Sequence, residues 1–179
     1  DVVEASVEGY YKDMRNQIEY GEGASPQNNG NTNYDYQLVF GKGYSYGLEL
    51  FVKKRTGKRT GWVGYTWSRT MRQFPDINQG REFPSRWDRR HDLSVVVSYE
   101  RSKRWNFGGA FVFATGQAVT LPVNRYFIEG QLVSEYTERN GYRMAPYHRL
   151  DLSATLNGRQ TKEVKDPTTG EVTQLKKKF

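Results

Sequence analysis

Cysteine is absent from this 179-residue sequence, which excludes a disulfide framework and a thiolate metal site. No apolar run approaches the about 20 residues that a transmembrane helix needs. Proline occurs only 6 times and glycine 18 times, without the repeat of collagen or the density of a proline-rich disordered chain. Leucine, isoleucine and alanine are scarce, so the composition also disfavours a helical protein.

Aromatic residues are abundant. They make up 15% of the chain, with 13 tyrosines and 4 tryptophans, and such rings favour β-strands. The mean hydropathy of −0.86 argues against a membrane protein built from helices. It does not exclude a membrane β-barrel, because only alternate residues of a spanning strand meet lipid while their neighbours face a wet lumen.

Apolar and polar residues alternate with a period of two along six segments. Leu48 and Leu50, for example, flank Glu49. No segment shows a competing helical stripe of apolar residues. The pattern predicts strands over residues 3–20, 37–54, 61–70, 93–101, 105–115 and 148–157. These reach about the 9–11 residues that cross a bilayer at a tilt, and the first two exceed them.

The connections between these strands alternate in length. Residues 21–36, 71–90 and 116–146 form long connections, whereas residues 55–60 and 101–104 form short ones. Spanning barrels show this alternation because their periplasmic turns are tight and their extracellular loops are extended. The sequence therefore predicts an all-β fold: an antiparallel transmembrane β-barrel segment with short periplasmic turns and long extracellular loops.

The same alternation predicts which side chains meet lipid. The expected lipid-facing residues are Leu48, Leu50, Val63, Leu93, Val95, Val97, Phe111, Phe113, Leu150 and Leu152. Amphipathic rings near strand ends are typical of the aromatic girdles of barrels, and the expected interfacial aromatics are Trp62, Tyr99, Trp105 and Tyr147. The alternative is a soluble sandwich core, which offers few polar partners for so many hydroxyl and indole N–H groups.

Basic residues crowd the two short connections and the end of the chain, which carries a net charge of +7. On the predicted periplasmic side they either reach inner-leaflet phosphates or simply keep the turns soluble. They do not gather on one groove-sized face, so we expect no nucleic-acid partner. The residues concerned are Lys53, Lys54, Arg55, Lys58, Arg59, Arg101, Lys103, Arg104 and Lys176 to Lys178.

Candidates for catalysis and metal binding are weak. His91 precedes Asp92, but adjacent strand residues point to opposite faces, so the two side chains do not form a catalytic dyad. Asp76, Asn78 and Glu82 carry oxygen ligands at a spacing too irregular for a calcium loop. We therefore expect no enzymatic activity, no cofactor and no metal site.

Several stretches, taken in chain order, resemble one family. They are residues 8–20, Gly43-Tyr-Ser-Tyr-Gly-Leu-Glu-Leu50, Gly64-Tyr-Thr-Trp-Ser68, Phe83-Pro-Ser-Arg-Trp-Asp-Arg-Arg-His-Asp-Leu93, residues 115–122 and Pro146-Tyr-His-Arg-Leu-Asp-Leu152. The ordered set is similar to the β-barrel of TonB-dependent outer-membrane receptors and covers most of the chain.

This resemblance implies a larger parent, a barrel of about 22 strands around an N-terminal plug. The chain would supply about six to eight strands from the C-terminal part of that barrel. Residues 1–157 are then barrel strands and extracellular loops, and residues 158–179 are a basic periplasmic turn or hairpin that leads to the missing final strands. We find neither the plug nor a signal peptide, so we expect a mature or internal segment.

The resemblance also implies a function: active uptake of a scarce solute across the outer membrane of a Gram-negative cell. The solute class (siderophore, vitamin, glycan or peptide) stays open. The implied partners are outer-membrane lipid, the rest of the barrel and its plug, and a periplasmic energy-coupling protein that acts through the plug. A surface lipoprotein or another outer-membrane subunit is a further candidate.

Ligand contacts in such a receptor come from the loops and the upper lumen. Guanidinium and aromatic groups suit anionic or ring-bearing ligands, and the candidates are Arg72, Arg81, Arg86, Trp87 and Tyr126. Two other functions fit the same sequence pattern. One is a non-transporting barrel that serves as a subunit or scaffold of an outer-membrane complex, and the other is a passive porin.

Overall fold

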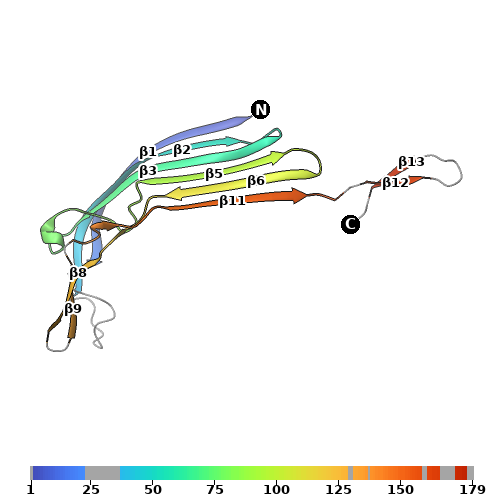
Figure 1. Ribbon diagram of the computed structural model, residues 1–179. Helices are drawn as coiled ribbons and strands as arrows, with labels where there is room; N and C mark the ends of the chain where they lie inside the picture. Colours follow the sequence, from blue (N-terminus) through green and yellow to red (C-terminus); the bar gives the residue numbers. More distant parts are fainter. Residues whose placement is uncertain are drawn as a thin grey trace.

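The fold was analysed in a computed structural model, which describes residues 2–22, 37–128, 131–136, 138–158, 161–165 and 172–176. Figure 1 shows one broad sheet with loops gathered at one end. Within the described residues, no helix has the length and apolarity needed to cross a membrane. The described regular structure is β-strand apart from one short 3₁₀ turn at Asn78–Gly80.

The main sheet is antiparallel and follows the chain in the order β1-β2-β3-β5-β6-β11. Its strands are β1 (Val3–Tyr20), β2 (Leu38–Lys54), β3 (Arg59–Gln73), β5 (His91–Glu100), β6 (Trp105–Ala114) and β11 (Tyr147–Leu156). The six predicted strands are confirmed, with ends that differ by at most three residues from those expected. Strands β1 and β11 are the two edges of this path, so the chain forms an arc of a barrel and does not close one.

One face of the sheet carries the apolar residues of the alternating pattern; we call it the apolar face. Directly opposed residues of neighbouring strands lie on the same face. The register joins Val52, Val63, Val95, Phe111 and Leu150 in one row across five strands. The neighbouring rows place all the other predicted lipid-facing residues on this face as well.

The opposite face, which we call the second face, is more polar. One of its rows runs through Glu8, Glu49, Thr66 and Asp92, and another contains Ser94. Along both faces of the described strands, no second sheet or helix covers the side chains: Leu150 is 62% and Leu152 79% exposed. A soluble sandwich would bury one of the two faces, so the expected single layer is confirmed.

The connections lie at opposite ends of the sheet, as predicted (Figure 1). Residues 55–58 and 101–104 form short turns at what we call the turn end. A backbone hydrogen bond from Glu100 N to Lys58 O, of 2.8 Å, holds these two turns side by side. Residues 74–90 and the described residues between 115 and 146 gather at the other end, the loop end.

The buried apolar side chains also lie at the loop end. Phe74, Ile77 and Phe83 are at most 2% exposed and pack with Val39 of β2. Gly41 makes room for this cluster, because a Cβ at this position would come within 2.5 Å of the Phe74 ring. This apolar cluster therefore lies at the loop end, where residues of the loop 74–90 pack against β2.

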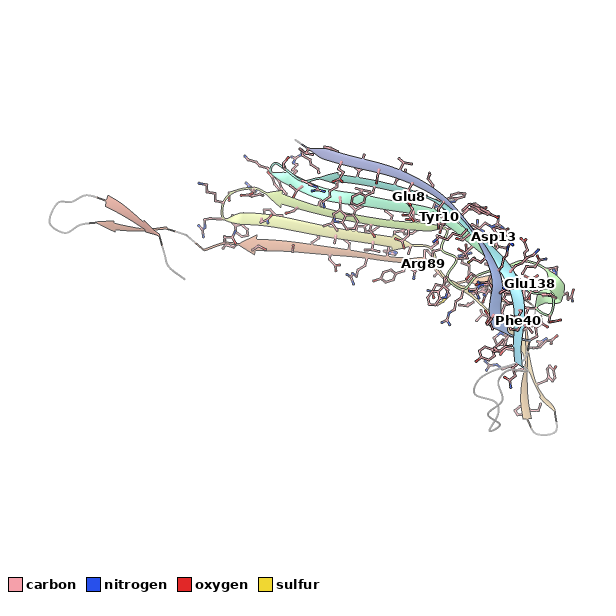
Figure 2. The ribbon with its side chains drawn as sticks, turned by 180° about the vertical axis from the view of Figure 1, so that it is seen from behind. Glu8, Tyr10, Asp13, Phe40, Arg89 and Glu138 are labelled. Atoms are coloured by element: carbon pink, nitrogen blue, oxygen red, sulfur yellow. The ribbon has the colours of Figure 1, made fainter. Side chains whose placement is uncertain are left out.

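Strands β1 and β2 extend beyond the rest of the sheet and bend. The register between them shifts between Met14 and Gln17, and Asn16 adopts a φ of 54°. Bulges of this kind bend and twist a strand pair. Figure 2 shows Asp13 at the bend and Phe40 on the bent arm beyond it. The predicted length of the second strand, residues 37–54, is confirmed by β2.

The long connections contain strands that the sequence pattern did not reveal. Residues 71–90 were expected to be a loop, but β4 (Phe83–Pro84) pairs with β3. Residues 116–146 include β7 (Ala118–Val119), β8 (Pro122–Ile128), β9 (Gln131–Tyr136) and β10 (Tyr142–Arg143), with β7 pairing to β10 and β8 to β9. Beyond β11, β12 (Thr161–Lys165) and β13 (Val172–Lys176) pair as a hairpin.

Candidate functional site

A fully buried carboxylate organises the loop end. Asp88 is 0% exposed, and its Oδ1 accepts a 2.7 Å hydrogen bond from the backbone N of Thr70 on β3. Its Oδ2 pairs with Arg143 Nη2 at 2.5 Å and Arg90 Nε at 3.3 Å. Arg143 Nη1 also donates to the carbonyl oxygens of Asp88 and Gly116, at 2.6 and 2.9 Å. This network fastens both long loops to the sheet.

A second network joins the same loops to the end of β1. The side-chain oxygen of Asn78 accepts a 2.7 Å bond from Arg139 N, and Asn78 N donates to Glu22 at 2.7 Å. Arg139 Nη2 donates to the carbonyl of Tyr20. Asn140 Nδ2 donates to the carbonyl of Pro84 at 2.9 Å. The loop end is therefore a cross-linked unit, which presents its exposed residues on a fixed frame.

Two of the predicted ligand-binding arginines are engaged within this unit. Arg72 Nη1 pairs with Glu19 at 3.0 Å, and its side chain is only 23% exposed. Arg81 lies 3.5 Å from Glu138 and donates to the carbonyl of Asn78. The first contact joins β3 to β1, and the second joins the two long loops. Both side chains are therefore weaker ligand candidates than the sequence suggested.

The other three candidates are available to a ligand. The Arg86 guanidinium lies 5.7 Å from the centre of the Trp87 ring, and Trp87 is 69% exposed. Tyr126 is 44% exposed on β8. No hydrogen bond or ion pair between described residues joins Tyr126 to the Arg86–Trp87 pair. The exposed ligand candidates therefore form the guanidinium–aromatic pair Arg86–Trp87 and a separate exposed ring, Tyr126.

Two adjoining clefts lie at the bend of β1 and β2. The larger, of about 360 Å³, is lined by Phe40, Gly41, Lys42, Gln73, Pro75 and Gly80. The smaller, of about 210 Å³, shares Lys42 and Gln73 and adds Tyr11, Asp13, Gly43, Tyr44, Arg72 and Glu82. The Tyr44 hydroxyl donates a 3.0 Å hydrogen bond to Glu82. Partial burial, together with this bond, raises the pKa of Tyr44 above its ordinary value.

The family model described as TonB dependent receptor-like, beta-barrel, matches residues 1–165. The chain belongs to the TonB-dependent receptor β-barrel family. No curated protein and no solved structure matched it. TonB-dependent receptors are a family of outer-membrane transport proteins, and the antiparallel sheet seen here is one section of such a barrel.

The aromatic girdle predicted for this TonB-dependent receptor barrel needs a correction. Tyr99 and Trp105 lie on the apolar face, as expected. Trp62 is opposite Lys53 and Val96, and Tyr147 is opposite Ala114, which places both rings on the second face. Their position at strand ends suggested a lipid interface, but the register of the sheet decides the face.

The histidine positions in this receptor barrel match the expectation. His91 lies opposite Trp67 on the apolar face, whereas Asp92 lies opposite Thr66 on the second face. His91 Nδ1 forms a 2.8 Å hydrogen bond with the Tyr65 hydroxyl. The predicted separation of the His91 and Asp92 side chains is therefore confirmed.

The weak calcium candidates of the receptor loop have protein partners instead. Asn78 binds Arg139, and Glu82 binds Tyr44. In the part of the chain that the structure describes, no cluster of acidic or histidine side chains has the arrangement of a metal site.

Proposed function

We propose that this chain is part of the barrel of an active transporter that takes up a scarce solute across the outer membrane. The observation that carries the proposal is the uncovered single sheet, with apolar residues in continuous rows on one face and more polar residues on the other. In this proposal the apolar face meets lipid, the second face lines the lumen, the loop end is extracellular and the turn end is periplasmic.

The proposal includes partners that lie outside this chain. The remaining strands would complete the barrel, because open strand edges in lipid leave backbone groups unpaired at several kcal/mol each. A plug would fill the lumen, and a periplasmic energy-coupling protein would act on the plug. A barrel of this size without a plug would behave as an open pore.

The fixed loop end supports a role in ligand recognition. The Asp88 and Asn78 networks hold the loops in place before a ligand arrives, which reduces the ordering entropy that binding must overcome. Among the predicted contact residues, Arg86, Trp87 and Tyr126 remain exposed on this frame. We propose that the Arg86–Trp87 pair is the main ligand contact within the loop of residues 74–90.

Uptake experiments separate this proposal from its alternatives. A strain lacking the receptor should stop growing on low concentrations of one solute class among ferric siderophores, vitamins, glycans and peptides, and should recover at high concentrations. Deleting the energy-coupling protein should reproduce the defect. A passive porin would conduct ions in planar bilayers without the coupling protein, and a scaffold would show no growth defect for any solute.

The ligand contact can be tested once the solute class is found. Replacing Trp87 with alanine should raise the half-saturating concentration for uptake about tenfold, because an exposed anchor ring typically contributes more than 1 kcal/mol. Replacing Trp105 with alanine, at the turn end, is the matched control and should leave uptake affinity unchanged. An unchanged affinity in the Trp87 variant would exclude this pair from the binding site.

A further inference from the structure

The turn end of the apolar face carries an arginine beside a row of aromatic rings. Arg59 of β3 lies opposite Tyr99 of β5, which lies opposite Phe107 of β6. The Arg59 guanidinium is 5.6 Å from the centre of the Tyr99 ring. The Trp105 and Phe107 rings are stacked, with centres 5.9 Å apart and planes within 5°. These rings lie on the face that we propose to meet lipid.

Four cations at this position form no ion pair with another described residue: Lys58, Arg59, Arg101 and Lys103. Arg55 differs, because it is paired with Glu4 at 2.7 Å. Glu100 is close in sequence, yet it lies opposite Asn106 on the second face. The hydrogen bond between Glu100 N and Lys58 O brings the two basic turns together. The result is a positive rim directly beside the aromatic row.

An apolar row adjoins the aromatic row on its other side. Val97 of β5 lies opposite Gly61 of β3 and Gly109 of β6, and it is 53% exposed. Val97 Cγ2 and Leu152 Cδ2 lie over Gly109, 3.3 and 3.5 Å from the place that a Cβ would take there. A side chain is not tolerated at Gly61, where φ is 154° and a Cβ would lie 2.2 Å from the Val96 carbonyl oxygen. Same-face rows along a strand are about 7 Å apart, so this apolar row lies one such step from Arg59 and Tyr99.

We propose that this surface binds an anionic phospholipid of the periplasmic leaflet. The inference rests on the proposed orientation, in which the apolar face meets lipid and the turn end is periplasmic. The lipid phosphate contacts Arg59, whose guanidinium is held in position by the Tyr99 ring. The Tyr99 and Trp105 rings lie at headgroup depth, and an acyl chain lies against Val97 between the two glycines.

The combination of features favours this occupant over others. A free phosphate ion needs the cations but gains nothing from an uncovered apolar row next to them. A zwitterionic phospholipid satisfies Arg59 but leaves the rest of the positive rim without a counter-charge. An anionic headgroup complements the whole rim, and each Lys or Arg near such a surface contributes about 1 kcal/mol.

The test uses the full receptor chain in nanodiscs that contain phosphatidylethanolamine and phosphatidylglycerol. Native mass spectrometry then counts the phosphatidylglycerol molecules retained by each variant. Arg59→Gln should retain about fivefold less than the wild type, the ratio that corresponds to the loss of one such contact. Lys42→Gln, a matched change on the same face at the loop end, should retain as much as the wild type. Equal retention in all three proteins, or equal loss in both variants, overturns the proposal.

Two further arms identify the part of the lipid that binds. Tyr99→Leu keeps an apolar side chain but removes the ring beneath Arg59, and it should reduce retention less than Arg59→Gln does. The fluorescence of Trp105 is the part of the emission that is lost when Trp105 is replaced with phenylalanine. Phosphatidylglycerol with brominated acyl chains should selectively quench this part. Millimolar inorganic phosphate should not displace the lipid. Displacement by phosphate alone, or absence of this quenching, contradicts a lipid site.

Failure of this inference is distinguishable from failure of the proposed function. Cell fractionation and energy-dependent uptake are measured for the same variants. A wild-type receptor that resides in the outer membrane and transports its solute, yet retains no phosphatidylglycerol, excludes only the lipid site. A wild-type protein that is absent from the outer membrane contradicts the proposed function itself.

Discussion

Replacing Arg143 with methionine should loosen the loop end by about 3–5 kcal/mol, because the change removes the main partner of the fully buried Asp88 carboxylate. Only Arg90, at 3.3 Å, and the backbone N of Thr70 would then remain to stabilise the charge. The prediction concerns local opening of the loops, which native-state hydrogen exchange measures. Backbone amides bonded within this unit, such as Met144 N to Gln117 O, should exchange at least a hundredfold faster.

A matched arginine and a double variant serve as controls. Arg149 pairs with Asp151 at 2.8 Å, but the two side chains are 62% and 54% exposed. Arg149→Met should therefore leave the exchange rates of the loop amides almost unchanged. Adding Asp88→Asn to Arg143→Met should restore part of the protection, since no buried charge is left unpaired. A double variant as unstable as Arg143→Met alone would show that lost packing, and not the orphaned carboxylate, causes the effect.

Arginine at Val95 should destabilise the barrel by about 2–4 kcal/mol, because this position is in the middle of the row that we assign to the centre of the bilayer. Val95 lies between Val63 and Phe111 on the apolar face. Its neighbour Ser94 faces the other way, between Gly64 and Val112. Arginine at Ser94 should be far less destabilising, since this face meets water in the lumen.

The two variants control for the effect of the introduced side chain, because both place an arginine in the same strand. Unfolding by denaturant in lipid vesicles gives the free energy of unfolding of each variant. Equal losses at the two positions would argue against a lipid-facing assignment of Val95. A larger loss at Ser94 would reverse the assignment of the two faces.

The sheet was predictable because its physical signal is local. Period-two alternation places side chains on faces without knowledge of the fold, and it identified β1 through β11 of the main path within a few residues. Alternating connection lengths then predicted which strand ends lie together. Short elements such as β4 and β7 have only two residues each, too few for any period to be visible.

The loop end was far less predictable, because its contacts join residues distant in the sequence. Arg72 and Arg81 looked like ligand contacts, but their partners Glu19 and Glu138 lie 53 and 57 positions away along the chain. Asp88 offers one signal in the sequence: it is the single carboxylate in residues 86–90, where the other four residues are three arginines and a tryptophan. A lone acid in such surroundings is a candidate for a buried ion pair.

The predicted interfacial aromatics show a different limit of prediction from the sequence. Strand ends were located well enough to find the rings, but a ring's face depends on its exact register. Trp62 follows Gly61 by one position, and this single step moves its side chain from the apolar face to the second face, where it packs against Phe51 at 6.0 Å.

The central claim is that one face of this sheet meets hydrocarbon and the other meets water. The chain has no cysteine, so single cysteines introduced at positions 93 to 98 each carry one spin label without interference. Paramagnetic resonance in lipid vesicles then compares the accessibility of each label to oxygen, which partitions into lipid, with that to a water-soluble nickel complex. The account predicts strict alternation, with labels at Leu93, Val95 and Val97 exposed to oxygen and those at Ser94, Val96 and Ser98 exposed to nickel. Uniform accessibility along the strand, or burial of Val95 from both reagents, would contradict it.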